Sequence, residues 1–170
     1  MSSYNVPPES PYYFLADSEI AAWYAFMKVQ LRIRYEMNRQ LLDTSGITLA
    51  VYDVLVALTS EPSRTLTISD LAIRIGAERS RISHQVRRMS RDSLVTLRPK
   101  LQDRRATDVT LTDEGRAVLA EATPPHIAFV RSVFVDALTP QQTSEVAIAF
   151  ENIYRLLIQH GTLPSPGDHP

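Results

Sequence analysis

Between an aperiodic N-terminal arm and an aperiodic C-terminal tail, apolar residues of this 170-residue chain recur at helical spacing, and this spacing is interrupted between residues 94 and 112. In that stretch LVTLRPK and DVTLT predict two short strands. Two compact helical segments precede them, one starting at Thr67 and one from Ser80 to about Asp92, separated by Gly76 and a short turn. The chain is long enough for one domain with a core, and this pattern predicts a mostly α-helical fold with a small β-hairpin.

This order of elements, with two short helices joined by a tight turn and then a hairpin, is typical of a winged helix-turn-helix. A long helix precedes this region, capped by Asp17 or Ser18 and stopped at Gly46. Its apolar residues lie on more than one side, which predicts burial against a second chain as well as its own. Threonines are predicted to cap the later helices, at Thr48, Thr67, Thr112 and Thr139.

Prolines at two places shape the predicted helices of the C-terminal part. Pro124-Pro125 predicts a kink or a restart of the helix that follows the strands, with Thr123 as a new cap. Thr139-Pro140 starts a last helix that runs to about His160. The predicted organisation is an N-terminal arm at 1–16, a helical dimerisation region at 17–46 and 113–160, a winged helix-turn-helix region at 47–112, and a flexible tail at 161–170.

The charge distribution is uneven although the net charge is only −1. Between Arg64 and Thr107 there are eleven Lys and Arg against four Asp and Glu, a local balance of +7, whereas the rest of the chain carries −8. An ordinary solvated surface is one explanation. The other is a footprint for a polyanion, because a basic stripe within a neutral chain is typical of nucleic-acid binding.

The helix predicted at 80–92 separates its apolar and basic residues. At 100° per residue, Ile82, Val86 and Met89 form one stripe that we expect to be buried. The opposite face carries no acid, which an ordinary surface helix does not explain, and it suits the major groove of DNA. The predicted DNA-contacting residues of this face are Ser80, Arg81, His84, Arg87 and Arg88, with Gln85 at its edge.

The wing, residues 94–112, carries the stretch DRRAT at its tip. Beside a recognition helix, the tip would bring Asp103, Arg104 and Arg105 to the minor groove, whose negative potential attracts arginine. We expect Asp103 to hold one guanidinium in position rather than to touch DNA itself. The alternative is a local ion pair in an exposed loop, which contributes little.

Several function classes find no support in the sequence. Cysteine is absent, which excludes disulfides, thiolate nucleophiles and cysteine-based sensing. No apolar run approaches the ~20 residues that span a membrane, and the N-terminus does not read as a signal peptide, so a soluble cytoplasmic protein is expected. Glycine-rich phosphate loops, paired-histidine metal motifs and serine elbows are missing, so we expect no enzyme, no cofactor and no metal site. The remaining alternative is a helical protein-interaction module with an incidental basic surface.

The stretch DRRATDVTLTDEG resembles the wing signature of the MarR (multiple antibiotic resistance regulator) family: Asp-x-Arg, a strand, and Leu-Thr-x-x-Gly. The matching residues are Asp103, Arg105, Leu111, Thr112 and Gly115. TISDLAIRIGAERSRISHQVRRMSRDSLV resembles the family's helix-turn-helix, including its Leu-Ala pair at 71 and 72. Two departures are Ser93, where the family usually has glycine, and His84, where a different base-reading side chain is common, so the target sequence does not carry over.

The resemblance implies a homodimer joined by the first and last helices, and a transcriptional regulator, usually a repressor, on a palindromic operator in double-stranded DNA. It also implies release by a small, often aromatic or anionic effector, bound between the dimer helices and the winged domain. The residues that could face such a ligand are Trp23, Tyr24, Asp53, Arg98 and His126. Alternatively, Trp23 and Tyr24 belong to a core or interface, and Asp53 and Arg98 pair.

Overall fold

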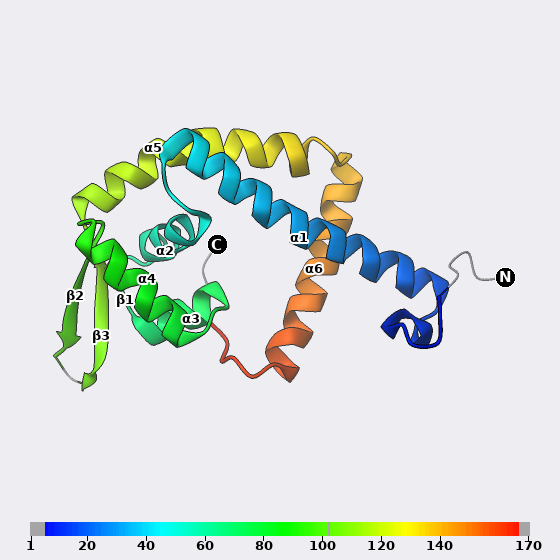
Figure 1. Ribbon diagram of the computed structural model, residues 1–170, viewed down its shortest axis with the longest axis horizontal. Coiled ribbons are helices and arrows are strands. Elements are labelled where there is room, and N and C mark those ends of the chain that lie inside the picture. Colours follow the sequence, from blue (N-terminus) through cyan, green and yellow to red (C-terminus); the bar gives the residue numbers. More distant parts are fainter. Residues whose placement is uncertain (1–5, 102, 167–170) are drawn as a thin grey trace. The chain divides into compact units, whose positions relative to one another are not determined.

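The computed structural model describes residues 6–101 and 103–166, except for the side chain of Arg104. They form two compact units, one up to Met37 and one from Asn38 onward. The predicted class, mostly α-helical with a small antiparallel sheet, is confirmed (Figure 1). In chain order the elements are η1 (Pro11–Phe14), α1 (Asp17–Ser45), α2 (Leu49–Thr59), β1 (Thr65–Thr67), α3 (Ile68–Ile75), α4 (Arg79–Arg91), β2 (Val95–Lys100), β3 (Asp103–Leu111), α5 (Asp113–Val130), η2 (Arg131–Val135) and α6 (Pro140–His160).

The predicted helix caps are confirmed at all four threonines. Thr48, Thr67, Thr112 and Thr139 each accept, through Oγ1, the backbone N–H of the residue three positions on, at 3.0–3.3 Å. These bonds satisfy N–H groups that a helix start leaves without an intrahelical partner. The first helix begins differently from the prediction, because Asp17 is its first residue and the carboxylate of Glu19 accepts the N–H of Ala16 at 2.8 Å.

The predicted restart at the proline pair is wrong. Helix α5 continues through Pro124 and Pro125 to Val130, and the hydroxyl of Thr123 donates to the carbonyl of Leu119 at 2.7 Å inside the helix instead of capping a new one. Each proline removes one hydrogen bond, to the carbonyl of Ala120 or Glu121 four residues earlier, and its ring crowds the same carbonyl. Both of these residues are exposed, so water can satisfy their carbonyls.

The sheet in the second unit has three strands in the order β1-β3-β2, all antiparallel. Strand β1 was not predicted, and β3 begins at Asp103, five residues before the predicted strand. Strand β1 is only three residues long, and its pairing with β3 includes a contact between the hydroxyls of Thr65 and Thr110 at 2.9 Å. A strand this short depends on its long-range partner, which local periodicity does not reveal.

The core of the second unit lies between helices α2, α3 and α4 and the sheet. Its most completely buried members include Leu55 and Leu58 of α2, Leu71 of α3, Met89 of α4, and Val109 of β3. Helix α6 differs sharply, since none of its 21 residues is buried. Its exposed side chains include Ile148, Ile153, Tyr154, Leu156 and Leu157.

The helices of the described residues include no single candidate for a membrane span. No single helix there is both long and apolar enough to cross a bilayer, and only α1 and α2 taken together, as a bent pair, meet the length and composition criteria.

The turn between α4 and β2 places a non-glycine residue in a left-handed conformation. Ser93 has φ 61°, its N–H donates to the carbonyl of Ser90 at 3.2 Å, and its carbonyl accepts the Thr112 hydroxyl at 2.7 Å. A left-handed conformation costs about 1–2 kcal/mol for a residue with a Cβ. The departure from the glycine of the MarR pattern therefore carries a local cost.

Ser93→Gly is expected to stabilise the protein by about 0.5–1 kcal/mol, because the relief of the left-handed strain exceeds the larger entropy that glycine loses on folding. Thermal unfolding should show a midpoint higher by roughly 1–4 °C. Ser90→Gly, the same substitution inside α4, serves as the control and should destabilise by up to about 1 kcal/mol. An unchanged or lower midpoint for Ser93→Gly would contradict the assignment of strain.

Candidate nucleic-acid interface

Helix α4 separates an apolar from a basic face as predicted. Ile82, Val86 and Met89 are at most 4% exposed and pack into the core. The helix contains five arginines, one histidine and no acidic residue. The predicted DNA-contacting residues Ser80, Arg81, His84, Arg87 and Arg88 are all exposed, and Gln85 is half-buried at the edge.

Two further arginines of α4 are exposed and were missed. Arg91 lies nine positions after Ile82, which at 100° per residue places it opposite the buried stripe, and it is exposed. Arg79 is the first residue of α4, and its Nε donates to the hydroxyl of Ser69 in α3 at 3.2 Å. Arg91 lies within the predicted helix, and the same helical projection places it on the polar face, whereas Arg79 precedes the predicted start of the helix and falls beside the buried stripe.

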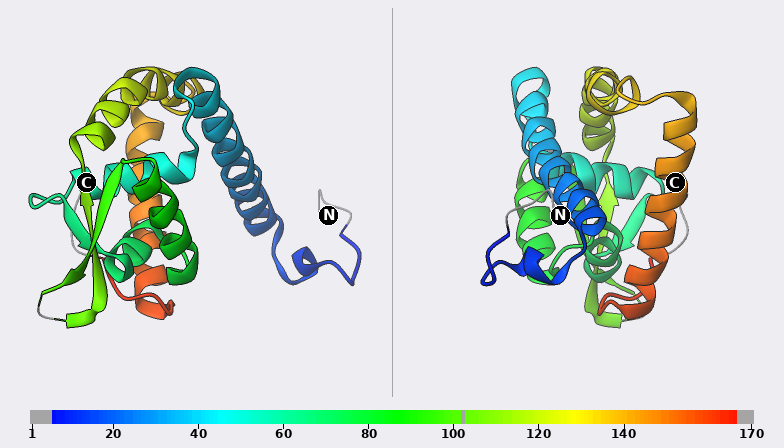
Figure 2. Two further views of the ribbon diagram at one scale, coloured as in Figure 1. Left: turned by 60° about the vertical axis from the view of Figure 1, so that its left-hand side comes forward. Right: turned by 90° about the vertical axis from the view of Figure 1, so that its right-hand side faces the viewer.

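The β2–β3 hairpin lies beside α4 and extends past it (Figure 1; Figure 2, left). At its tip the carboxylate of Asp103 accepts the backbone N–H of Arg105 at 3.0 Å. We expected Asp103 to hold a guanidinium, but the contact that the structure describes is with the main chain. The side chain of Arg105 is exposed, and that of Arg104 lies outside the described residues.

The base of the hairpin is fastened to the first turn of α5. The hydroxyl of Thr112 lies 2.7 Å from the carbonyl of Ser93 and 2.8 Å from that of Leu94. Gly115 approaches the same segment so closely that a Cβ at this position would lie 2.2 Å from the carbonyl oxygen of Leu94. A glycine is therefore required where α5 passes the start of β2.

Of the proposed ligand-facing residues, His126 is buried and has a polar side-chain partner, Gln40. It is 2% exposed, and its Nδ1 lies 2.7 Å from Oε1 of Gln40, while its ring packs against Tyr52. Gln40 donates its Nε2–H to Thr44 at 2.9 Å, so its Oε1 faces the imidazole and His126 Nδ1 is the donor. Burial lowers the pKa of His126, and the nearby charge of Asp53 opposes that shift.

The other proposed ligand residues are spread over the molecule. Arg98 lies exposed on β2, in register with Asp108 of β3. Trp23 and Tyr24 belong to the first unit and are half-exposed. Among the described residues, no group of three His, Cys, Asp or Glu side chains is placed to hold a metal ion.

An open groove of about 610 Å³ runs between the end of α2 and the first turns of α5. Apolar side chains such as Leu119 and Pro124 form most of its lining, with Thr59 and Arg116 among the polar residues. None of the five proposed ligand residues lines this groove.

Comparison with known proteins decides the family. A model of the MarR family matches residues 45–106. The structure of Sco3205 from Streptomyces coelicolor, solved in complex with DNA, is 30% identical and aligns over 89% of this chain and 99% of that one, with a TM-score of 0.83. The chain belongs to the MarR family. AbsC from the same organism is 31% identical, over 86% of this chain and 99% of its own, with a TM-score of 0.79.

Membership of the MarR family confirms three predictions. The chain is a transcriptional regulator of the DNA-binding class, its fold is a winged helix-turn-helix, and it is not an enzyme. A relative, the HTH-type transcriptional repressor MdtR of Bacillus subtilis, is 29% identical over 101 residues, which is 59% of this chain and 61% of MdtR. In MarR terms α3 and α4 form the helix-turn-helix and β2–β3 the wing.

Proposed function

We propose that the protein is a dimeric, sequence-specific repressor that binds a two-fold symmetric operator and responds to a small effector. The observation that carries the proposal is the basic, acid-free exposed face of α4 beside a hairpin whose tip exposes Arg105. A helix fits the major groove, and an arginine at the wing tip reaches the adjacent minor groove.

The proposed contacts divide by role. Ser80, Arg81, His84 and Gln85 lie in the first half of α4, the part of a recognition helix that reads base edges. Arg87 and Arg88, with Arg91, follow along the same helix and suit phosphates. Arg104 and Arg105 of the wing complete the footprint, and Asp103 fixes the backbone from which Arg105 extends.

The exposed apolar surface of the long helices supports a homodimer. In α6, Ile153 is 48% and Leu157 62% exposed, and in α1, Leu31 is 65% and Tyr35 59% exposed. Exposed apolar side chains in such numbers are typical of protein interfaces. The dimerisation region proposed is therefore residues 17–46 and 113–160, with 47–112 as the DNA-binding region.

Repression and effector binding complete the proposal. Repression is proposed from the similarity to the transcriptional repressor MdtR, and a small aromatic or anionic effector from the family resemblance. For the effector, Trp23, Tyr24, Asp53, Arg98 and His126 remain the proposed candidates, although the hydrogen bond to Gln40 already occupies one nitrogen of His126. A DNA-binding regulator acts where the chromosome is, so cytoplasmic localisation belongs to the same proposal.

Selection of bound sequences from random duplex DNA tests the proposal. A dimer with one recognition helix per subunit should enrich two inverted half-sites about 10 bp apart, one turn of B-DNA. Affinity for the selected site should fall steeply with salt, because each neutralised phosphate releases counterions. A failure to enrich any sequence, or enrichment of sites without two-fold symmetry, would contradict the proposal.

A further inference from the structure

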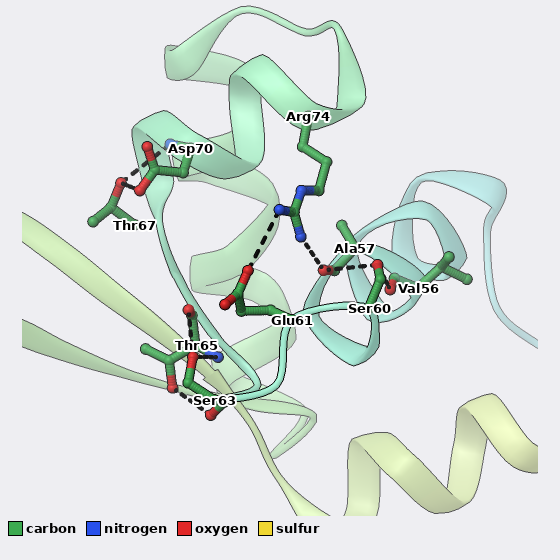
Figure 3. A network of polar contacts seen from close by, with 9 residues as sticks. All are labelled: Val56, Ala57, Ser60, Glu61, Ser63, Thr65, Thr67, Asp70 and Arg74. Atoms are coloured by element: carbon green, nitrogen blue, oxygen red, sulfur yellow. Dashed lines mark hydrogen bonds and ion pairs between the residues drawn. The ribbon is translucent and has the colours of Figure 1, made fainter. Parts of the chain in front are cut away.

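One arginine of the basic segment is turned into the protein instead of toward DNA. The side chain of Arg74, on α3, is only 8% exposed. Its Nη1 donates to the carbonyl of Ala57 at 3.1 Å, and its Nη2 lies 3.4 Å from Oε2 of Glu61 (Figure 3). Both ends of the guanidinium are therefore engaged by the protein, and Arg74 does not add to the surface that meets the phosphates.

The first partner of Arg74 marks the end of α2. Ala57 lies in the last turn of that helix, where carbonyls lack N–H partners farther along the helix. The hydroxyl of Ser60 lies 3.3 Å from the same oxygen, so Ser60 and Arg74 together satisfy it. A cation is favourable at this negative end of a helix. Arg74 thereby fastens α3, and α4 beyond Gly76, to the end of α2.

The second partner of Arg74 is Glu61, which lies in the turn between α2 and strand β1 of the sheet. The carbonyl of Glu61 accepts the N–H of Arg64 at 2.8 Å, which closes the turn before β1. The carbonyl of Arg64, a residue with φ 54°, accepts the N–H of Leu111 at the end of β3 at 3.0 Å. Glu61 therefore belongs to the turn that joins α2 to the sheet of which the wing is part.

We propose that Arg74 is a positioning residue for DNA binding, which holds α4 and the wing in a fixed relation so that one subunit can engage both grooves at once. The inference rests on the proposed function, in which α4 enters the major groove and Arg105 the minor groove. Arginine suits this role because its planar fork bonds two acceptors in fixed directions, whereas lysine presents a single point charge.

The test is a double-mutant cycle between Arg74→Ala and Arg105→Ala, measured in the full-length protein by fluorescence anisotropy with the selected operator and with a scrambled duplex. Arg74→Ala alone should weaken operator binding about 3- to 10-fold and change binding to the scrambled duplex less than about twofold. In the Arg74→Ala background, the loss caused by Arg105→Ala should shrink by about threefold or more, because a wing that is no longer held in place has less contact to lose.

Arg116→Ala is the matched control. Arg116 also pairs with an acid, Asp113, at 3.3 Å, but its side chain is 50% exposed on α5. The substitution Arg116→Ala removes the same charge as Arg74→Ala. The fold losses of operator affinity caused by Arg116→Ala and Arg105→Ala should therefore multiply in the double mutant, within about twofold. Partial unfolding of the Arg74→Ala variant would lower its affinity for every duplex by the same factor. The loss of operator affinity caused by Arg105→Ala would then be unchanged in that background, so only the positioning role predicts a smaller loss.

Each result of the double-mutant cycle either supports or overturns the positioning role of Arg74. Operator binding by Arg74→Ala equal to wild type, or losses that multiply with those of Arg105→Ala, would overturn the inference. If circular dichroism shows Arg74→Ala unfolded, Glu61→Gln takes its place in the cycle: a reduced loss from Arg105→Ala supports the inference and a multiplicative loss overturns it. Failure of the proposed function itself appears earlier and separately, as wild-type protein that binds no selected duplex.

Discussion

Replacing Arg105 with alanine is expected to weaken operator binding by about 5- to 150-fold, because a specific arginine contact is typically worth ~1–3 kcal/mol. The side chain is exposed near the tip of the wing, where it can enter a narrow minor groove. Titration of labelled operator with wild type and variant measures the ratio. Circular dichroism should show the variant folded, since the substitution removes no buried group.

Variants of Asp103 decide how the wing tip holds that arginine. Since the carboxylate accepts the backbone N–H of Arg105, Asp103→Ala should weaken operator binding even though it removes a negative charge near DNA. Asp103→Asn keeps an acceptor oxygen and should bind at least as tightly as wild type. Charge repulsion alone predicts tighter binding for both variants, so a gain of affinity by Asp103→Ala would show that the acid is an ordinary surface charge.

Gly115→Ala is expected to destabilise the protein by about 1–3 kcal/mol or more, as overpacked sites do. The added methyl group would lie 2.2 Å from the carbonyl oxygen of Leu94 and 2.8 Å from Cδ1 of Leu111. The leucine side chain can move, but the Leu94 carbonyl is main chain and is held by Thr112 at 2.8 Å. At a helix position without such a neighbour, glycine to alanine would instead gain up to about 1 kcal/mol.

Thermal unfolding measures this effect, which for a chain of this size corresponds to a midpoint lower by roughly 2–12 °C. Glu114→Ala, the exposed neighbour in the same turn, is the control and should remain within about 0.5 kcal/mol of wild type. Because the clash displaces the start of β2, operator affinity should fall as well. A midpoint equal to or above that of wild type would contradict the close approach of α5 to β2.

Features set by nearby residues could be predicted from the sequence. The threonine caps depend on a side chain and an N–H three residues apart, and the buried stripe of α4 depends on a helical period. Strand β1 depends instead on pairing with residues of β3 some 45 positions later in the chain. The early start of β3 depends on the pairing of Asp103 with Lys100 at an irregular point of the β2–β3 register. The prolines in α5 misled because their cost depends on whether the freed carbonyls reach water, which the local pattern does not specify.

The candidate interface shows the same division. The exposed face of α4 followed from its period, whereas the inward turn of Arg74 did not, because its partners lie 13 and 17 positions earlier in the chain. Counting charges between Arg64 and Thr107 therefore overestimates the cations that face DNA by at least Arg74. The main-chain contact of Asp103 with the N–H of Arg105 was not predicted, because a short acid reaches the nearby main chain as readily as a flexible guanidinium.

The absence of buried residues in α6 has a consequence for regulation in the cell. If a second copy covers this helix, folding and assembly are one equilibrium, and the apparent stability rises with protein concentration by mass action. At concentrations below the dimer dissociation constant, the amount of DNA-binding species then grows with the square of the number of chains. A modest change in synthesis or degradation would thus alter operator occupancy more than proportionally, without any change in affinity for DNA.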